Sequence, residues 1–88
     1  MSKIHPSAII DKGCTIGKNV TIGANTVIEG NVKIDDDNII YPSVYIGGNT
    51  DIGKSNKIFS FSSIGAIPQD LKFKNETSKL RIGEKNTI

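Results

Sequence analysis

Residues 10–28 read IDKGCTIGKNVTIGANTVI, with an isoleucine at every sixth position. The same spacing runs without a gap from Ile4 to Ile64, and Ile82 and Ile88 return to the same phase. On an α-helix, steps of six turn the chain by about 600°, which scatters these side chains over several stripes. In an extended chain an even step keeps them all on one side. The repeat therefore predicts short β-strands that share one buried face.

A second position, two residues before each isoleucine, faces the same side and holds mostly small side chains. Its occupants are Ala8, Cys14, Val20, Thr26, Val32, Val44, Thr50, Asn56 and Ser62. Glycine often follows the isoleucine directly, and Asn or Gly often stands two residues further on. Those later positions, where left-handed backbone is expected at a sharp corner, include Gly13, Asn19, Asn25, Asn31 and Asn49. We expect a corner in every hexad.

Flat strands with a corner every six residues close into a triangular coil of three hexads, and coils stack about 4.8 Å apart. The predicted fold class is therefore all-β, with columns of isoleucine as its core. A β-sandwich with accidental periodicity is disfavoured because the matches are consecutive and all are isoleucine. The pattern resembles the hexapeptide-repeat family, and this resemblance implies a left-handed parallel β-helix. The spacing alone gives no handedness.

Composition narrows the functional classes. The 88 residues suit one small domain, and 11 basic against 9 acidic side chains give a net charge of +2, too mild to indicate nucleic-acid binding. Cys14, the single cysteine, falls on the small inward position and is expected to be a buried structural thiol. His5 stands beside a proline without other metal-ligand residues, so we expect no metal site. No signal peptide or membrane-spanning run is visible, which predicts a cytoplasmic protein.

One hexad departs from the pattern at Asp35-Asp36-Asp37-Asn38. We interpret it as a solvated corner, with Asn38 on the inward position satisfying backbone groups. A cation site is the weaker alternative, because the acids are consecutive and lack the alternate spacing of a calcium loop.

The ladder stops at Ile64, since its next in-phase residues, Asp70 and Glu76, cannot face an apolar core unpaired. We expect one partial domain over 1–88, with regular coils at 1–65, an extruded loop at 66–79 and resumed coil at 80–88. Because eighteen residues separate Ile64 from Ile82, the segment could instead replace one full coil. Loops on a rigid scaffold often carry function, so this loop is the first candidate site.

Three segments carry a more specific resemblance: SIGAIPQDLKF at 63–73, LRIGEKN at 80–86 and IHPSAII at 4–10. Together they are similar to the N-terminal third of the acyl-carrier-protein-dependent UDP-N-acetylglucosamine O-acyltransferases of lipid A synthesis. This resemblance implies a homotrimer that transfers a (3R)-hydroxyacyl group from acyl carrier protein to the 3-hydroxyl of the sugar nucleotide. Gln69, Asp70 and Lys72 match the substrate-binding motif. A carboxylate suits sugar hydroxyls, and an ammonium suits a phosphate or a developing oxyanion.

The family's general-base histidine lies in a later coil, and His5 matches no catalytic motif. We therefore assign no catalytic residue and expect no cofactor. The family's C-terminal coils and helical region have no counterpart in this sequence, so we expect an N-terminal fragment that is inactive alone.

Other functions remain open. A sugar O-acetyltransferase that uses acetyl-CoA shares the same repeats, and the sequence does not decide between a 3-hydroxyl and a 3-amino acceptor. A γ-type carbonic anhydrase needs several histidines, and only His5 is present. A non-catalytic binding module, such as an ice-binding helix, needs a face of repeated threonines, which this sequence interrupts with Val27, Lys33, Ile39 and Lys57.

Overall fold

The computed structural model describes residues 2–65 and 80–88, in which every regular element is a short β-strand. The strands are β1 (Lys3–Ile4), β2 (Ile9–Ile10), β3 (Thr15–Ile16), β4 (Thr21–Ile22), β5 (Val27–Ile28), β6 (Asn31–Ile34), β7 (Ile39–Ile40), β8 (Tyr45–Ile46), β9 (Asn49–Ile52), β10 (Lys57–Ile58), β11 (Ser63–Ile64) and β12 (Leu80–Ile82). Each strand ends on a residue of the isoleucine ladder. Among the described residues, no helix is long and apolar enough to cross a membrane.

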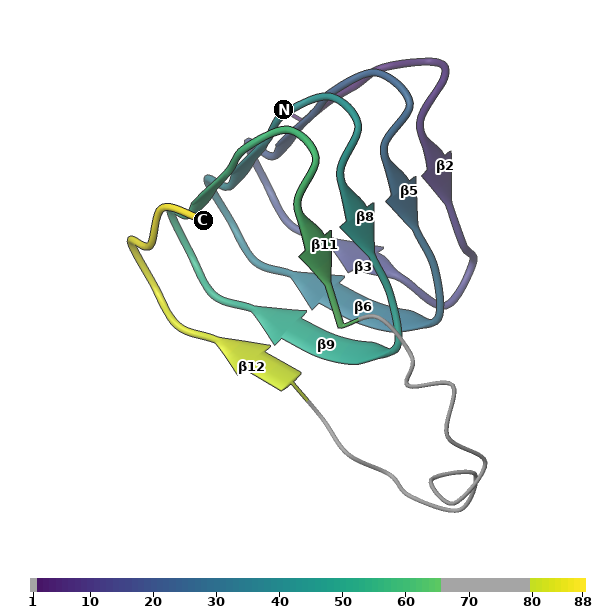
Figure 1. Cartoon of the computed structure of the whole chain (residues 1–88). Helices are drawn as coiled ribbons and strands as arrows, with labels where there is room; N and C mark the ends of the chain where they lie inside the picture. Colours follow the sequence, from purple (N-terminus) through teal and green to yellow (C-terminus); the bar gives the residue numbers. More distant parts are fainter. Residues whose placement is uncertain (1, 66–79) are drawn as a thin grey trace.

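The strands form three parallel sheets of four strands each. Sheet A has the order β1-β4-β7-β10, sheet B the order β11-β8-β5-β2, and sheet C the order β12-β9-β6-β3. Ladder residues pair directly across neighbouring strands, as Ile22 does with Ile40 and Ile28 with Ile46. Successive strands of the chain lie on successive faces, and the coils stack along one axis (Figure 1). The predicted left-handed parallel β-helix is confirmed.

The core consists of the two predicted inward positions. The ladder isoleucines of the central coils are at most 2% exposed, and they are Ile22, Ile28, Ile34, Ile40, Ile46, Ile52 and Ile58. The second position is buried at Val20, Thr26, Val32, Asn38, Val44, Thr50 and Asn56. Cys14 also faces inward and packs against this core, but it is half-buried rather than buried, with its Sγ atom 3.6 Å from the carbonyl oxygen of Gly30. Alternating side-chain direction therefore selects the core as expected.

The corners stack from coil to coil in three columns, one between each pair of sheets. Two of these columns turn at the expected position. Left-handed backbone occurs three residues after the isoleucine at Asn19, Asn25, Asp37, Ser43, Ser55, Phe61 and Lys85. The expectation was wrong for Gly13, Asn31 and Asn49, which lie in the corner between sheets B and C. There the left-handed residues are Gly30, Gly48 and Gly65. This corner turns earlier in the hexad, so β6 and β9 begin earlier and are four residues long.

Glycine is required in that corner because successive coils touch through it. An added Cβ at Gly48 would lie 2.7 Å from the carbonyl oxygen of Gly65, and one at Gly30 would lie 2.5 Å from that of Gly48. Gly65 is the last residue described before the 66–79 segment. Gly65 therefore lies in a corner whose stacking admits no side chain.

Past that segment the chain returns to the neighbouring face. β12 pairs with β9 in register, Arg81 opposite Asp51 and Ile82 opposite Ile52. The eighteen residues from Ile64 to Ile82 thus advance the chain by one face, a step that takes six residues elsewhere in the β-helix. The expected loop at 66–79 lies outside the described residues, so it stays a prediction.

Candidate functional site

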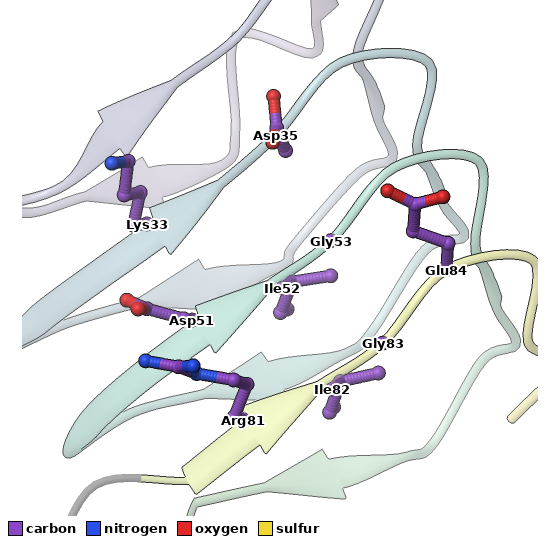
Figure 2. A pocket seen from close by; sticks show the side chains of 9 residues that line it. All are labelled: Lys33, Asp35, Asp51, Ile52, Gly53, Arg81, Ile82, Gly83 and Glu84. Atoms are coloured by element: carbon purple, nitrogen blue, oxygen red, sulfur yellow. The ribbon is translucent and has the colours of Figure 1, made fainter.

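The candidate site begins with a column of charged side chains on the outer surface of sheet C. Lys33, Asp51 and Arg81 stand one position before their ladder isoleucines, so their side chains point outward while the isoleucines point inward. The strand register places Asp51 directly opposite both Lys33 and Arg81. In Figure 2 the three side chains project from neighbouring strands on the same side. The column therefore carries positive, negative and positive charge in turn.

A hollow of about 250 Å³ lies beside this column. Its lining consists of Lys33, Asp35, Asp51, Ile52, Gly53, Arg81, Ile82, Gly83 and Glu84. Gly53 and Gly83, which come directly after ladder isoleucines, contribute no side chain to the hollow. Asp35 and Glu84 contribute carboxylates from the adjacent corner (Figure 2). The hollow thus has a row of alternating charge along one side and carboxylates along the other.

Arg81 gives this surface its recognition chemistry. A guanidinium presents several N–H groups in a fixed plane, which suits paired hydrogen bonds to a carboxylate or a phosphate. Its strand, β12, is the one on which the chain returns from residues 66–79. The hollow therefore lies on the face that the chain joins directly after the predicted substrate-binding segment.

The predicted binding residues Gln69, Asp70 and Lys72 lie outside the described residues, so their binding role stays a prediction. Sequence reasoning missed Lys33, Asp51 and Arg81 as a group. All three occupy the same hexad position, but eighteen residues separate the first pair and thirty the second. Only the pairing of β12 with β9 brings Arg81 into the column.

At the acidic corner, the interpretation of Asn38 as a backbone partner is confirmed. Its Nδ2 donates to the carbonyl oxygens of Asp35 and Gly53, both at 2.7 Å. Asp36 Oδ1 accepts the backbone N–H of Lys18 at 2.8 Å. Within residues 2–65 and 80–88, no group of three or more His, Cys, Asp or Glu is arranged to hold a metal ion.

At the first corner, the exposed His5 lies 2.9 Å from the Ser7 hydroxyl, and its Nδ1 accepts the Ser7 backbone N–H at 3.1 Å. The ring thus caps a local turn.

A protein-family model and several solved structures are similar to this chain. The model of the bacterial transferase hexapeptide family, described as six repeats, matches residues 1–30. The chain also superimposes on a solved UDP-N-acetylglucosamine acyltransferase with a TM-score of 0.90 and 44% sequence identity, covering 98% of this chain. This chain belongs to the hexapeptide-repeat family.

Two further solved structures show the same likeness. The UDP-N-acetylglucosamine acyltransferase LpxA of Bacteroides fragilis matches with a TM-score of 0.89 and 46% identity over 97% of this chain. The UDP-N-acetylglucosamine O-acyltransferase LpxA of Moraxella catarrhalis matches with a TM-score of 0.77 and 40% identity over 96%. This chain covers 33% of the first two structures and 35% of the third, so it spans about a third of their length.

Proposed function

We propose that this chain is part of a UDP-N-acetylglucosamine O-acyltransferase that acts in lipid A synthesis. The single observation that carries the proposal is the match to a UDP-N-acetylglucosamine acyltransferase at a TM-score of 0.90 and 44% identity over nearly the whole chain. Hexapeptide repeats alone occur in many transferases, whereas the matched structures are UDP-N-acetylglucosamine acyltransferases. The reaction transfers a (3R)-hydroxyacyl group from acyl carrier protein to the 3-hydroxyl of the sugar nucleotide.

In this proposal, Gln69, Asp70 and Lys72 bind the sugar nucleotide. The Asp70 carboxylate accepts hydrogen bonds from sugar hydroxyls, and the Lys72 ammonium faces the phosphates or the oxyanion that develops at the ester carbonyl. The resemblance of residues 63–73 to the binding motif of this family supports the assignment.

The general base that removes the proton of the attacking hydroxyl belongs to a part of the enzyme beyond this chain. We assign no catalytic residue here, because His5 is exposed and engaged in a turn with Ser7. The complete enzyme is proposed to be a cytoplasmic homotrimer that receives its acyl group from acyl carrier protein.

The proposal is tested by supplying the full-length protein with UDP-N-acetylglucosamine and two donors in parallel, a (3R)-hydroxyacyl acyl carrier protein and acetyl-CoA. Mass spectrometry of the sugar nucleotide reports the group transferred, and hydrolysis with mild base separates an ester from an amide. We expect an ester formed from the carrier-protein donor only. Transfer from acetyl-CoA alone would favour the sugar O-acetyltransferase, and no transfer from either donor would favour a binding module.

A further inference from the structure

Phe61 combines an unusual backbone with an unusual exposure. Its φ angle is +68°, in the left-handed region that bulky side chains disfavour, and its side chain is 88% exposed. On the two preceding coils the same corner position holds Asn25 and Ser43, which are smaller and polar. Burial in the core therefore does not explain a phenylalanine here, and strained backbone of this kind clusters at ligand-binding sites.

Phe61 forms one wall of a groove of about 350 Å³ that lies between two columns of side chains. One column is the corner between sheets A and B, which contributes Asn25, Ser43 and Phe61. The other is the outward position of β5, β8 and β11, which contributes Val27, Tyr45 and Ser63. These three strands lie side by side on sheet B (Figure 1). Each coil thus adds one hydrogen-bonding side chain and one apolar or aromatic side chain to the groove.

The polar side chains of the groove are uncharged and keep their hydrogen-bonding capacity for a ligand. They belong to Asn25, Ser43, Ser62 and Ser63. Within residues 2–65 and 80–88, these four residues use backbone groups in their hydrogen bonds, and their side-chain hydroxyls and amide have no partner. A hydroxyl both donates and accepts, and an amide side chain offers one group of each kind. The groove can therefore pair with several hydroxyl groups of a ligand at once.

The Tyr45 ring, on the other wall, is fixed before any ligand arrives. Its hydroxyl donates to Oε1 of Glu29 at 2.8 Å, and its ring lies over Gly47, where an added Cβ would collide with it. Glu29 itself does not line the groove. A side chain that is already held in place loses little conformational entropy on binding. Tyr45 therefore serves as a rigid apolar wall opposite the corner column.

We propose that this groove binds a neutral saccharide. A sugar ring exposes C–H groups on its faces and hydroxyls around its rim, so it matches a site that mixes aromatic walls with uncharged hydrogen-bonding groups. A phosphate or a nucleotide needs a cationic partner, and none of the described side chains that line the groove is charged. A hydrocarbon chain would remove the three serines and Asn25 from water without giving them partners. The volume of about 350 Å³ is near the lower end for small-molecule sites, which suits a small sugar.

This inference goes beyond the proposed acyl transfer and does not depend on it. The probe is methyl β-D-glucopyranoside, whose equatorial hydroxyls leave both ring faces apolar, added to the full-length protein. Saturation-transfer NMR should show transfer to the C–H protons of the sugar, saturating with a Kd of about 1 mM. UDP-N-acetylglucosamine should not displace the glucoside, because the groove offers its diphosphate no cation. Displacement would assign the glucoside to the substrate site and would overturn the inference.

Phe61→Asn is the decisive variant. Asparagine occupies the same left-handed position at Asn19 and Asn25, so this change relieves the backbone and retains the fold while it removes the aromatic wall. We expect the Kd to rise about tenfold or more, with the β-type circular dichroism spectrum unchanged. Ser63→Val removes one hydroxyl at a strand position where Val27 already stands, and it should raise the Kd about 3- to 10-fold.

Phe59→Ser is the matched control. Phe59 is also an exposed aromatic residue of this corner, at 43%, but it packs against Tyr41 and does not line the groove. Its variant should bind the glucoside within about twofold of wild type. Absence of saturation transfer to the wild type, wild-type affinity in Phe61→Asn, or an equal loss in Phe59→Ser would overturn the inference. Acyl transfer is measured in a separate assay, so failure of the saccharide site is distinguishable from failure of the proposed reaction.

Discussion

Asn38 and Asn56 stack one coil apart in the core, where the Oδ1 atom of Asn38 accepts the backbone N–H of Asn56 at 2.8 Å. The contact repeats on the next coil, where Asn56 Oδ1 accepts the backbone N–H of Asn86 at 2.8 Å. Both asparagine side chains are fully buried. Their amides therefore satisfy backbone groups that a corner without strand pairing would leave buried and unpartnered.

Asn38→Ala should destabilise the fold more than loss of an ordinary surface asparagine. The change removes the partner of the Asn56 backbone N–H and one donor each to the carbonyl oxygens of Asp35 and Gly53. We expect a loss of about 2–4 kcal/mol in the free energy of unfolding, measured in urea. Asn31→Ala, at an exposed position, is the control. A loss equal to that of the control would contradict the role of the asparagine ladder.

Gly48→Ala and Gly83→Ala make the same chemical change with different expected results. Gly48 has a φ of +72° and a coil neighbour that an added Cβ would meet at 2.7 Å, so alanine should cost at least about 2 kcal/mol of folding stability. Gly83 has its nearest atom at 3.9 Å and no left-handed backbone. Its variant should stay within about 0.5 kcal/mol of wild type. Equal shifts in melting temperature would show that the corner tolerates side chains.

Ile40→Ala tests the central ladder. Its side chain is fully buried between coils, and truncation leaves a cavity, so we expect a loss of about 3–5 kcal/mol. Ile4→Ala makes the same truncation where the side chain is 45% exposed and should cost about half as much or less. Chemical denaturation of both variants gives the comparison, and an equally mild effect at Ile40 would argue against a close-packed column.

The Tyr45 hydroxyl should lose its proton at a higher pH than an unperturbed tyrosine. The hydrogen bond from its hydroxyl to Glu29, with burial and the negative charges of Glu29 and Asp11, raises the pKa of Tyr45 above its usual 10.0. Because the folded-state pKa is raised, the stabilisation is fully present below pH 10 and is lost as pH rises through the raised value. NMR of the Tyr45 ring should show ionisation at lower pH in Glu29→Ala. An unchanged midpoint would mean that the carboxylate does not set this pKa.

Asp70→Ala in the full-length enzyme should lower kcat/KM for UDP-N-acetylglucosamine by about 10- to 100-fold, the expected cost of a lost hydrogen bond that involves a charged group. Lys72→Ala should have a comparable effect through the phosphates or the oxyanion. Glu76→Ala changes a carboxylate of the same segment that matches no family binding position, and it should leave turnover near wild type. Wild-type kinetics for Asp70→Ala would remove Asp70 from the site.

The corners show where sequence reasoning reached its limit for the fold. Periodicity placed Asn19 and Asn25 correctly because those corners follow one hexad plan. It misplaced the turn at Asn31 and Asn49, since a glycine one position earlier can take the left-handed conformation instead. Which residue turns depends on how neighbouring coils stack, and the stacking at Gly30 and Gly48 is a contact between residues distant in the sequence.

By itself the sequence determined the class of fold, the three faces and the core, because side chains alternate along an extended chain and six is an even period. It also marked 66–79 as the break in the repeat and, through resemblance, Gln69, Asp70 and Lys72 as candidate binding residues. Only the tertiary structure decided that Arg81 lies opposite Asp51 and that Phe61 faces solvent. The spacing from Ile64 to Ile82 does not say which strand β12 pairs with, and periodicity does not say whether a side chain at a corner is exposed. The partner strand and the exposure both depend on how neighbouring coils stack in three dimensions.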